Sequence, residues 1–219
     1  NCYWTLEVTA SAEPQRQRII PDGTIEMAFI LGDDIKRYTS DDDYIIQPRA
    51  MVLGQTVEPF YIEPTGYVNT FAIRFYPYGF ANFVSLPIKE LANTETPLHV
   101  LYGEEAAEQL EQDIIQASEV KARIQIIETF LLGKLSETAM VDHIVKDTIE
   151  ALLATNGKAA ISTILKEDKA KRRQLERKFA KQIGISPKQL GKLIRLQAAL
   201  KMLLNEEDKS LTHIAYENE

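Results

Sequence analysis

The sequence predicts an α+β protein in three parts: a β-rich domain, a helical linker and a basic all-α domain. Short runs rich in Tyr, Phe, Val, Ile and Thr are confined to about the first 100 residues. Eight of the 9 prolines also lie there, whereas the later sequence repeats apolar residues at helical spacing. Positive charge gathers near the C-terminal end. The predicted domains are residues 1–100, 101–155 and 156–219.

The β-rich domain is predicted to be a barrel or sandwich. Runs such as TIEMAFIL and YVNTFAIRFY are separated by turn signals such as Pro-Asp-Gly, a spacing typical of these folds. Its aromatic and polar side chains could line a small-molecule pocket. The candidate effector-binding residues are Trp4, Glu26, Arg74, Phe75, Tyr76 and Tyr78. The alternative is that most of them form the core of the barrel.

The linker is predicted to contain three helices, with the sequences EEAAEQLEQDIIQA, KARIQIIETFLLGKL and TAMVDHIVKDTIEALLATNG. Apolar residues occupy more than one side of the second helix: Ile124, Ile126, Ile127, Phe130, Leu131 and Leu132. Such a helix must bury two faces. We expect some of this surface to pack against a second copy of the chain, which would make the protein a homodimer.

Charge is divided unevenly along the chain. The formal net charge is -7, yet residues 158–201 hold 13 Lys and Arg against 3 Asp and Glu. A basic patch on an acidic protein suggests a polyanion partner, with nucleic acid as the first candidate. The alternative is a solvated helix face without such a partner.

The basic segment has the layout of a helix-turn-helix. Leu175, Phe179 and Ile183 recur every four residues and predict the buried stripe of a helix. The sequence GISP follows, in which Gly suits the left-handed position after a helix, Ser the next N-cap and Pro the first turn. A short helix before this unit and a long helix after it complete the pattern, whose second helix enters the major groove of DNA.

The charged side chains of this unit match what a DNA duplex requires. Arginine suits bidentate contact with guanine, and lysine suits phosphates. We therefore predict that Arg173 and Arg177 read base edges. The candidate DNA-binding residues are Lys171, Arg172, Arg173, Glu176, Arg177, Lys178, Lys181, Lys188 and Arg195.

The stretch RRQLERKFAKQIGISPKQLGKLIRLQAALKMLL resembles the DNA-binding domain of the AraC/XylS family of transcriptional regulators. In that family an Arg-x-Leu-x-Arg-x-Phe recognition helix precedes Gly-x-Ser-Pro and a long helix carrying Arg-x-x-x-Ala. The matching residues are Arg173, Leu175, Arg177, Phe179, Gly184, Ser186, Pro187, Arg195 and Ala199. The segments 18–29 and 73–91 also resemble the sensor half of one branch of this family.

The resemblance implies a transcriptional regulator that binds double-stranded DNA and responds to a small-molecule effector in a cupin-like N-terminal domain. Such regulators can also contact RNA polymerase. No apolar run reaches the length of a membrane span and no signal peptide is visible, so we predict a cytoplasmic protein without a membrane partner.

The sequence departs from the family pattern in two places. Lys169 and Lys171 stand where the family has Gly and Ser, and Leu165 stands where a small Ala is common. SLTHIAYENE at the C-terminal end matches the start of a second helix-turn-helix, through Ser210, Leu211, Ile214 and Ala215. The sequence stops where the second recognition helix should begin, with Glu219 where Gly is usual, so we expect this second motif to be incomplete.

The sequence offers little support for catalysis. His99, His143 and His213 lie in different segments without the spacing of metal ligands, and the His/Glu cluster of many cupin-type enzymes is missing. No Gly-rich phosphate loop or nucleophile motif is visible. We predict no enzymatic activity, metal or cofactor. The alternatives are an isomerase-like β-barrel enzyme with a helical appendage and a protein-interaction module that presents its basic helix to an acidic partner.

Overall fold

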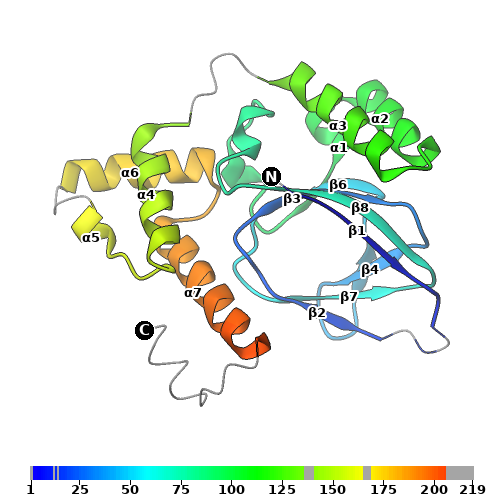
Figure 1. The fold of residues 1–219 in the computed structure, drawn as a ribbon, viewed down its shortest axis with the longest axis horizontal. Coiled ribbons are helices and arrows are strands. Elements are labelled where there is room, and N and C mark those ends of the chain that lie inside the picture. Colours follow the sequence, from blue (N-terminus) through cyan, green and yellow to red (C-terminus); the bar gives the residue numbers. More distant parts are fainter. Residues whose placement is uncertain (1, 12, 14, 136–140, 165–168, 206–219) are drawn as a thin grey trace.

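The computed structural model describes residues 2–11, 13, 15–135, 141–164 and 169–205 (Figure 1). Two antiparallel sheets form the N-terminal half, one with the strand order β1-β8-β3-β6-β9 and the other with the order β2-β7-β4-β5. The strands are β1 (Cys2–Val8), β2 (Gln17–Ile19), β3 (Ile25–Ile30), β4 (Ile35–Tyr38), β5 (Tyr44–Ile46), β6 (Ala50–Leu53), β7 (Phe60–Pro64), β8 (Val68–Phe75) and β9 (Glu95–Pro97). The predicted α+β fold with a two-sheet β domain is confirmed.

Strand β3 shows how the sequence divides this domain into layers. Side chains alternate between the two faces of a strand. Ile25, Met27 and Phe29 join the core cluster beneath the helices, whereas Ala28 and Ile30 join a separate cluster facing the second sheet. Because both faces are covered, the strand is apolar at nearly every position.

Helices α1 (Leu98–Tyr102), α2 (Glu104–Gln116) and α3 (Val120–Lys134) cover the outer face of the five-stranded sheet (Figure 1). Two short 3-10 helices, η1 (Phe80–Asn82) and η2 (Ile88–Glu90), precede them. Ile127 and Leu131 of α3 are buried, and Ile124, Ile126 and Phe130 pack against the same core. Most of the apolar surface of this helix, some of which was predicted to pack against a second copy, is therefore used within the chain.

Helices α4 (His143–Ala154), α5 (Ile161–Ile164), α6 (Lys169–Gln182) and α7 (Pro187–Leu204) lie to one side of the sheets (Figure 1). Val145, Ile149 and Leu152 of α4 share one buried cluster with Leu175 and Phe179 of α6. This cluster includes α4, so the packed C-terminal unit begins before the boundary at residue 156 that the sequence suggested.

The connection between α6 and α7 is built as its sequence predicts. Gly184 has a φ of +93°, the left-handed conformation that glycine adopts without strain. The side chain of Ser186 accepts a hydrogen bond from the Gln189 backbone N–H, and Pro187 occupies the first turn of α7. Residues 165–168, which include Leu165, and residues 206–219, which include the start of the second motif and Glu219, lie outside the described residues.

The C-terminal helices contact the β domain through the loop at 21–24. Gln197 of α7 donates a hydrogen bond of 2.8 Å from Nε2 to the carbonyl oxygen of Pro21. Gly23 lies so close to α7 that an added Cβ would be 3.0 Å from Leu190 Cδ1. A second contact brings Gly184 against Ile88 of η2. The loop therefore joins the β domain to the long helix of the C-terminal domain.

Candidate nucleic-acid interface and effector cavity

Helix α6 turns its charged side chains to solvent. Leu175 and Phe179 are fully buried on its inner side. Seven of the predicted DNA-binding residues are exposed: Lys171, Arg172, Arg173, Glu176, Arg177, Lys181 and Lys188. Arg173 and Arg177 are one helical turn apart and share a face. Glu176 forms an ion pair with Arg172, with 3.3 Å between Oε1 and Nε.

Two further candidates have structural partners. Lys178 is half-buried and forms an ion pair with Asp142, the N-cap residue of α4. The hydrogen bond from Lys178 is the main cause that lowers the pKa of the Asp142 carboxyl. Arg195 is half-buried against Gly157, in the turn between α4 and α5. Lys178 thus holds α6 on α4, a role that the sequence did not reveal because its partner lies 36 positions away.

Part of the basic surface is hollowed. Arg172, Lys188 and Arg195 line a cavity of about 380 Å³ beside the N-terminus of α7, together with Lys158 from the turn after α4. Backbone N–H groups at a helix N-terminus add to the attraction for a phosphate. Sequence reasoning missed Lys158, because it belongs to no motif and reaches this surface only through the packing of the turn on α7.

A larger cavity of about 620 Å³ lies between the two β-sheets. Three of the six effector-binding candidates line it, namely Trp4, Glu26 and Arg74. The other three do not line this cavity. Phe75 belongs to the core under the helices, Tyr76 is exposed, and Tyr78 packs against the C-terminal cluster. Strand alternation explains the case of Phe75, because it follows Arg74 and so points to the opposite face of β8.

Pairing of β3 with β8 assembles the polar group of this cavity. Glu26 lies opposite Arg74 in the register, and Arg74 Nε donates to Glu26 Oε1 at 2.6 Å. Trp4 Nε1 donates to the same oxygen at 3.3 Å, and Asp22 Oδ2 lies 3.5 Å from Arg74 Nη1. Burial raises the pKa of the Glu26 carboxyl above its ordinary value, and Arg74 acts in the opposite direction.

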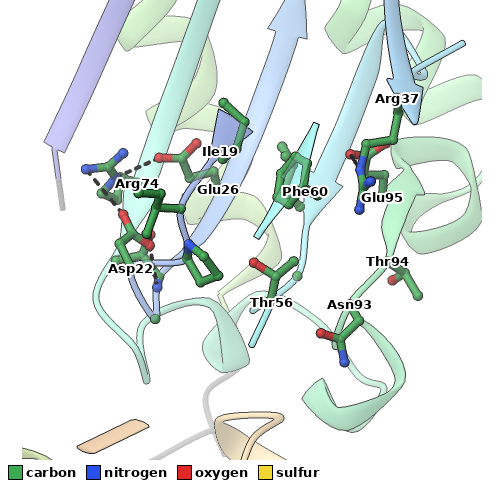
Figure 2. A pocket seen from close by; sticks show the side chains of 16 residues that line it. Ile19, Asp22, Glu26, Arg37, Thr56, Phe60, Arg74, Asn93, Thr94 and Glu95 are labelled. Atoms are coloured by element: carbon green, nitrogen blue, oxygen red, sulfur yellow. Dashed lines mark hydrogen bonds and ion pairs between the residues drawn. The ribbon is translucent and has the colours of Figure 1, made fainter. Parts of the chain in front are cut away.

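A second ion pair, between Arg37 and Glu95, lines a smaller cavity of about 110 Å³ that adjoins the first (Figure 2). Arg37 Nε lies 3.1 Å from Glu95 Oε1, which also accepts a hydrogen bond from Gln47. Figure 2 shows Phe60 between this pair and the group of Asp22, Glu26 and Arg74. Burial raises the pKa of Glu95 as well. Sequence reasoning missed Arg37 and Glu95, which come from strands far apart in the chain.

Both the β domain and the C-terminal domain match known protein families. Residues 1–97 match the family described as domain of unknown function DUF6597, and residues 166–218 match the family described as helix-turn-helix domain. A comparison with curated proteins found no match. Among solved structures, ToxT from Vibrio cholerae has a TM-score of 0.52 at 13% identity, covering 100% of this chain and 89% of that chain.

A second structure of ToxT, from Vibrio cholerae O395, has a TM-score of 0.50 at 14% identity and covers 99% of this chain and 87% of that chain. At this identity the likeness concerns the fold, and it extends over the β domain and the C-terminal helices alike. The predicted resemblance to AraC/XylS regulators is confirmed, and the chain carries an AraC-type helix-turn-helix domain at residues 166–218 on a fold shared with ToxT.

Proposed function

We propose that this protein is a transcriptional regulator that binds double-stranded DNA through α6 and is modulated by a small molecule held between its β-sheets. One observation carries the proposal: the AraC-type helix-turn-helix match covers the helix that exposes Arg173, Arg177 and Lys181. In helix-turn-helix proteins this second helix enters the major groove. In our proposal Arg173 and Arg177 read bases. Phosphates are contacted by Lys181 and by the basic residues that line the cavity beside α7, namely Lys158, Arg172, Lys188 and Arg195.

The effector part of the proposal is supported by the cavity between the sheets and by its position. The cavity has the size of a small-molecule site. The loop at 21–24 lines the adjoining smaller cavity and also contacts Leu190 and Gln197 of α7. A ligand that displaces this loop would therefore change how the DNA-binding domain is held.

The raised pKa values of Glu26 and Glu95 bear on the alternative that the β domain is an enzyme, because shifted carboxyls are common in catalytic sites. Each carboxyl is, however, engaged by an arginine, Arg74 or Arg37. We propose that these groups bind a ligand and perform no reaction.

The proposed assembly is a homodimer in the cytoplasm. Apolar side chains remain exposed on the outer helical layer, at Val100, Ile115, Val120, Leu132 and Leu135. Leu132 is 69% exposed at the end of α3, so this layer supplies the proposed dimer contact. Sedimentation equilibrium tests it, and a strict monomer at high micromolar concentration would contradict it. In the described part of the chain, no helix is long and apolar enough to cross a membrane.

The DNA-binding proposal is tested with duplexes selected from a random library by the full chain. Replacing Arg177 by Ala should cost roughly 1–3 kcal/mol on the selected duplex and relax discrimination at one base pair. Replacing Lys181 by Ala should weaken binding to all duplexes alike and lower the salt slope by about one unit. Fluorescence anisotropy over a salt series measures both effects.

The matched control is Arg18→Ala, which removes an exposed cation from β2, in the β domain and away from α6 (Figure 1). It should leave DNA affinity unchanged. Equal losses on selected and scrambled duplexes for Arg177→Ala would show that α6 is only an electrostatic patch. Failure to bind any duplex would overturn the proposed function.

A further inference from the structure

Acidic side chains outnumber basic side chains around the two adjoining cavities. The charged residues that line them are Glu13, Asp22, Glu26, Glu95, Arg37 and Arg74. Among the described residues, four carboxylates thus face two guanidinium groups, and no lysine lines either cavity. Charge in a partly desolvated site interacts more strongly than in water, so this excess favours a ligand that brings positive charge.

Both arginines are already engaged by acids of the chain. Arg74 contacts Glu26 at 2.6 Å and Asp22 at 3.5 Å. Arg37 contacts Glu95 at 3.1 Å and stacks on the Phe60 ring, with its Cζ 4.0 Å from the ring centroid. An anionic ligand would share these guanidinium groups with the carboxylates and would lie next to them. That arrangement costs energy through like-charge repulsion.

The carboxylates keep acceptor capacity for a donor. Trp4 and Arg74 both donate to Glu26 Oε1, which leaves Oε2 as the atom that a ligand can address. Glu95 Oε2 is buried without a hydrogen-bond partner. Buried polar atoms are normally satisfied, and one that is not calls for a donor such as a water molecule, an ion or a ligand group. Burial raises the pKa of both carboxyls despite the nearby arginines, so a further hydrogen-bond donor would offset part of the desolvation of these carboxylates.

Trp4 adds an aromatic surface to the carboxylate. Its indole N–H is fixed by the 3.3 Å hydrogen bond to Glu26, and its ring lines the larger cavity. An aromatic ring beside a carboxylate favours an ammonium group, through a charge-assisted hydrogen bond and a cation–π contact. The remaining wall is largely apolar and includes Leu6, Ala28, Ile30, Met51 and Ile62.

We propose that the cavity takes an amphipathic organic cation, with its ammonium group against Glu26 and Trp4 and its apolar body between the two sheets. The inference rests on the proposed role of this cavity as the effector site and adds the chemical class of the effector. The cavity of about 620 Å³ lies within the size range of known small-molecule sites.

The experiment compares three probes with the same apolar body: phenylbutylamine, phenylbutanol and phenylbutyrate. Isothermal titration calorimetry with the full chain at neutral pH gives the three dissociation constants. The amine should bind roughly tenfold more tightly than the alcohol, because only the amine adds the ionic hydrogen bond and the cation–π contact. The acid should bind least tightly.

Variants locate the source of this preference. Glu26→Gln keeps the shape of the site, removes its charge and should abolish the roughly tenfold preference for the amine over the alcohol. Trp4→Leu should lower the affinity for the amine more than that for the alcohol. Glu108→Gln, at an exposed position on α2, is the matched control and should leave all three affinities unchanged.

The outcomes separate this inference from the proposed function. Tighter binding of phenylbutyrate than of phenylbutylamine by the wild-type chain would overturn the inference, and so would the absence of binding by all three probes. Neither result touches the DNA titrations, which are done without any ligand. If Glu26→Gln does not fold, the comparison of amine and acid in the wild-type chain still decides the question.

Discussion

The two faces of the five-stranded sheet differ in what fills the space beside them. On the helix side, Phe29, Phe71 and Phe75 are almost completely buried in a continuous core. On the other side, small or polar residues such as Ala28 and Thr70 line a cavity of about 620 Å³. The same strands supply both faces. Core packing and the proposed ligand binding are therefore divided between alternate residues, and neighbouring positions in the sequence serve different purposes.

The largest expected effect comes from truncating a core side chain, Phe71, on the helix side of the sheet. Phe71 is fully buried and packs against Phe29, with 6.2 Å between the ring centroids. Phe71→Ala should reduce the free energy of unfolding by about 3–5 kcal/mol, because it leaves a hole in a filled core. Urea unfolding measures the loss. Thr70→Ala, at the preceding residue of the same strand but on the cavity side, should cost far less, and equal losses would contradict the division.

A second test concerns the loop at the cavity end of the β domain. Gly23 and Gly103 both have positive φ values, 77° and 85°, but only Gly23 faces a neighbour, Leu190. Replacing either by Val should cost roughly 1–3 kcal/mol through backbone strain. Only Gly23→Val should also increase hydrogen exchange of the backbone amides in α7. Equal exchange in the two variants would show that the loop does not hold this helix.

A third test inserts the same side chain on each face. Ala28 lines the cavity, whereas Ala50 belongs to the core under the helices. Ala28→Leu should change stability by less than about 1 kcal/mol because the cavity has room, while Ala50→Leu should cost about 1–3 kcal/mol by overpacking. Ala28→Leu should also weaken phenylbutylamine binding. A larger loss of stability for Ala28→Leu than for Ala50→Leu would refute the assignment of the two faces.

The smallest expected effect concerns the pKa values of two carboxyls, Glu26 in the cavity and Glu63 outside it. Burial raises the pKa of Glu26, so protonation favours its folded form and this contribution to stability grows as the pH falls toward 4.5. Lys36 lowers the pKa of Glu63. That contribution is present above pH 4.5 and is lost as the pH falls through the folded-state pKa. NMR titration of the two carboxyl carbons, assigned with Glu→Gln variants, should place them on opposite sides of 4.5.

The sequence predicted local features well. The caps around Gly184 and Ser186 and the buried stripe of α6 depend on residues a few positions apart, and the structure confirms them. Strand identity was also visible, but sheet membership was not. The run at 44–54 divides into β5 and β6, which belong to different sheets, on either side of Pro48.

Features that depend on contacts between distant residues could not be predicted. The bond from Gln197 to Pro21 spans 176 positions, and the one from Lys178 to Asp142 spans 36. Of the effector-binding candidates, Trp4, Glu26 and Arg74 line the cavity, whereas Arg37 and Glu95 were missed. Which face a strand residue occupies follows from alternation, but what lies opposite that face depends on how the sheets and helices come together.

The two contacts of the loop at 21–24 limit which residues can be changed when a new ligand specificity is selected. The loop borders the smaller cavity and also contacts α7, so in the proposed regulator its residues cannot be varied without disturbing the response to the ligand. A genetic screen for a new inducer would keep these four positions constant and randomise the cavity wall at Trp4, Ala28 and Thr70. A screen for mutants that no longer respond to any compound would do the opposite, and its hits would gather in the loop and on the facing side of α7.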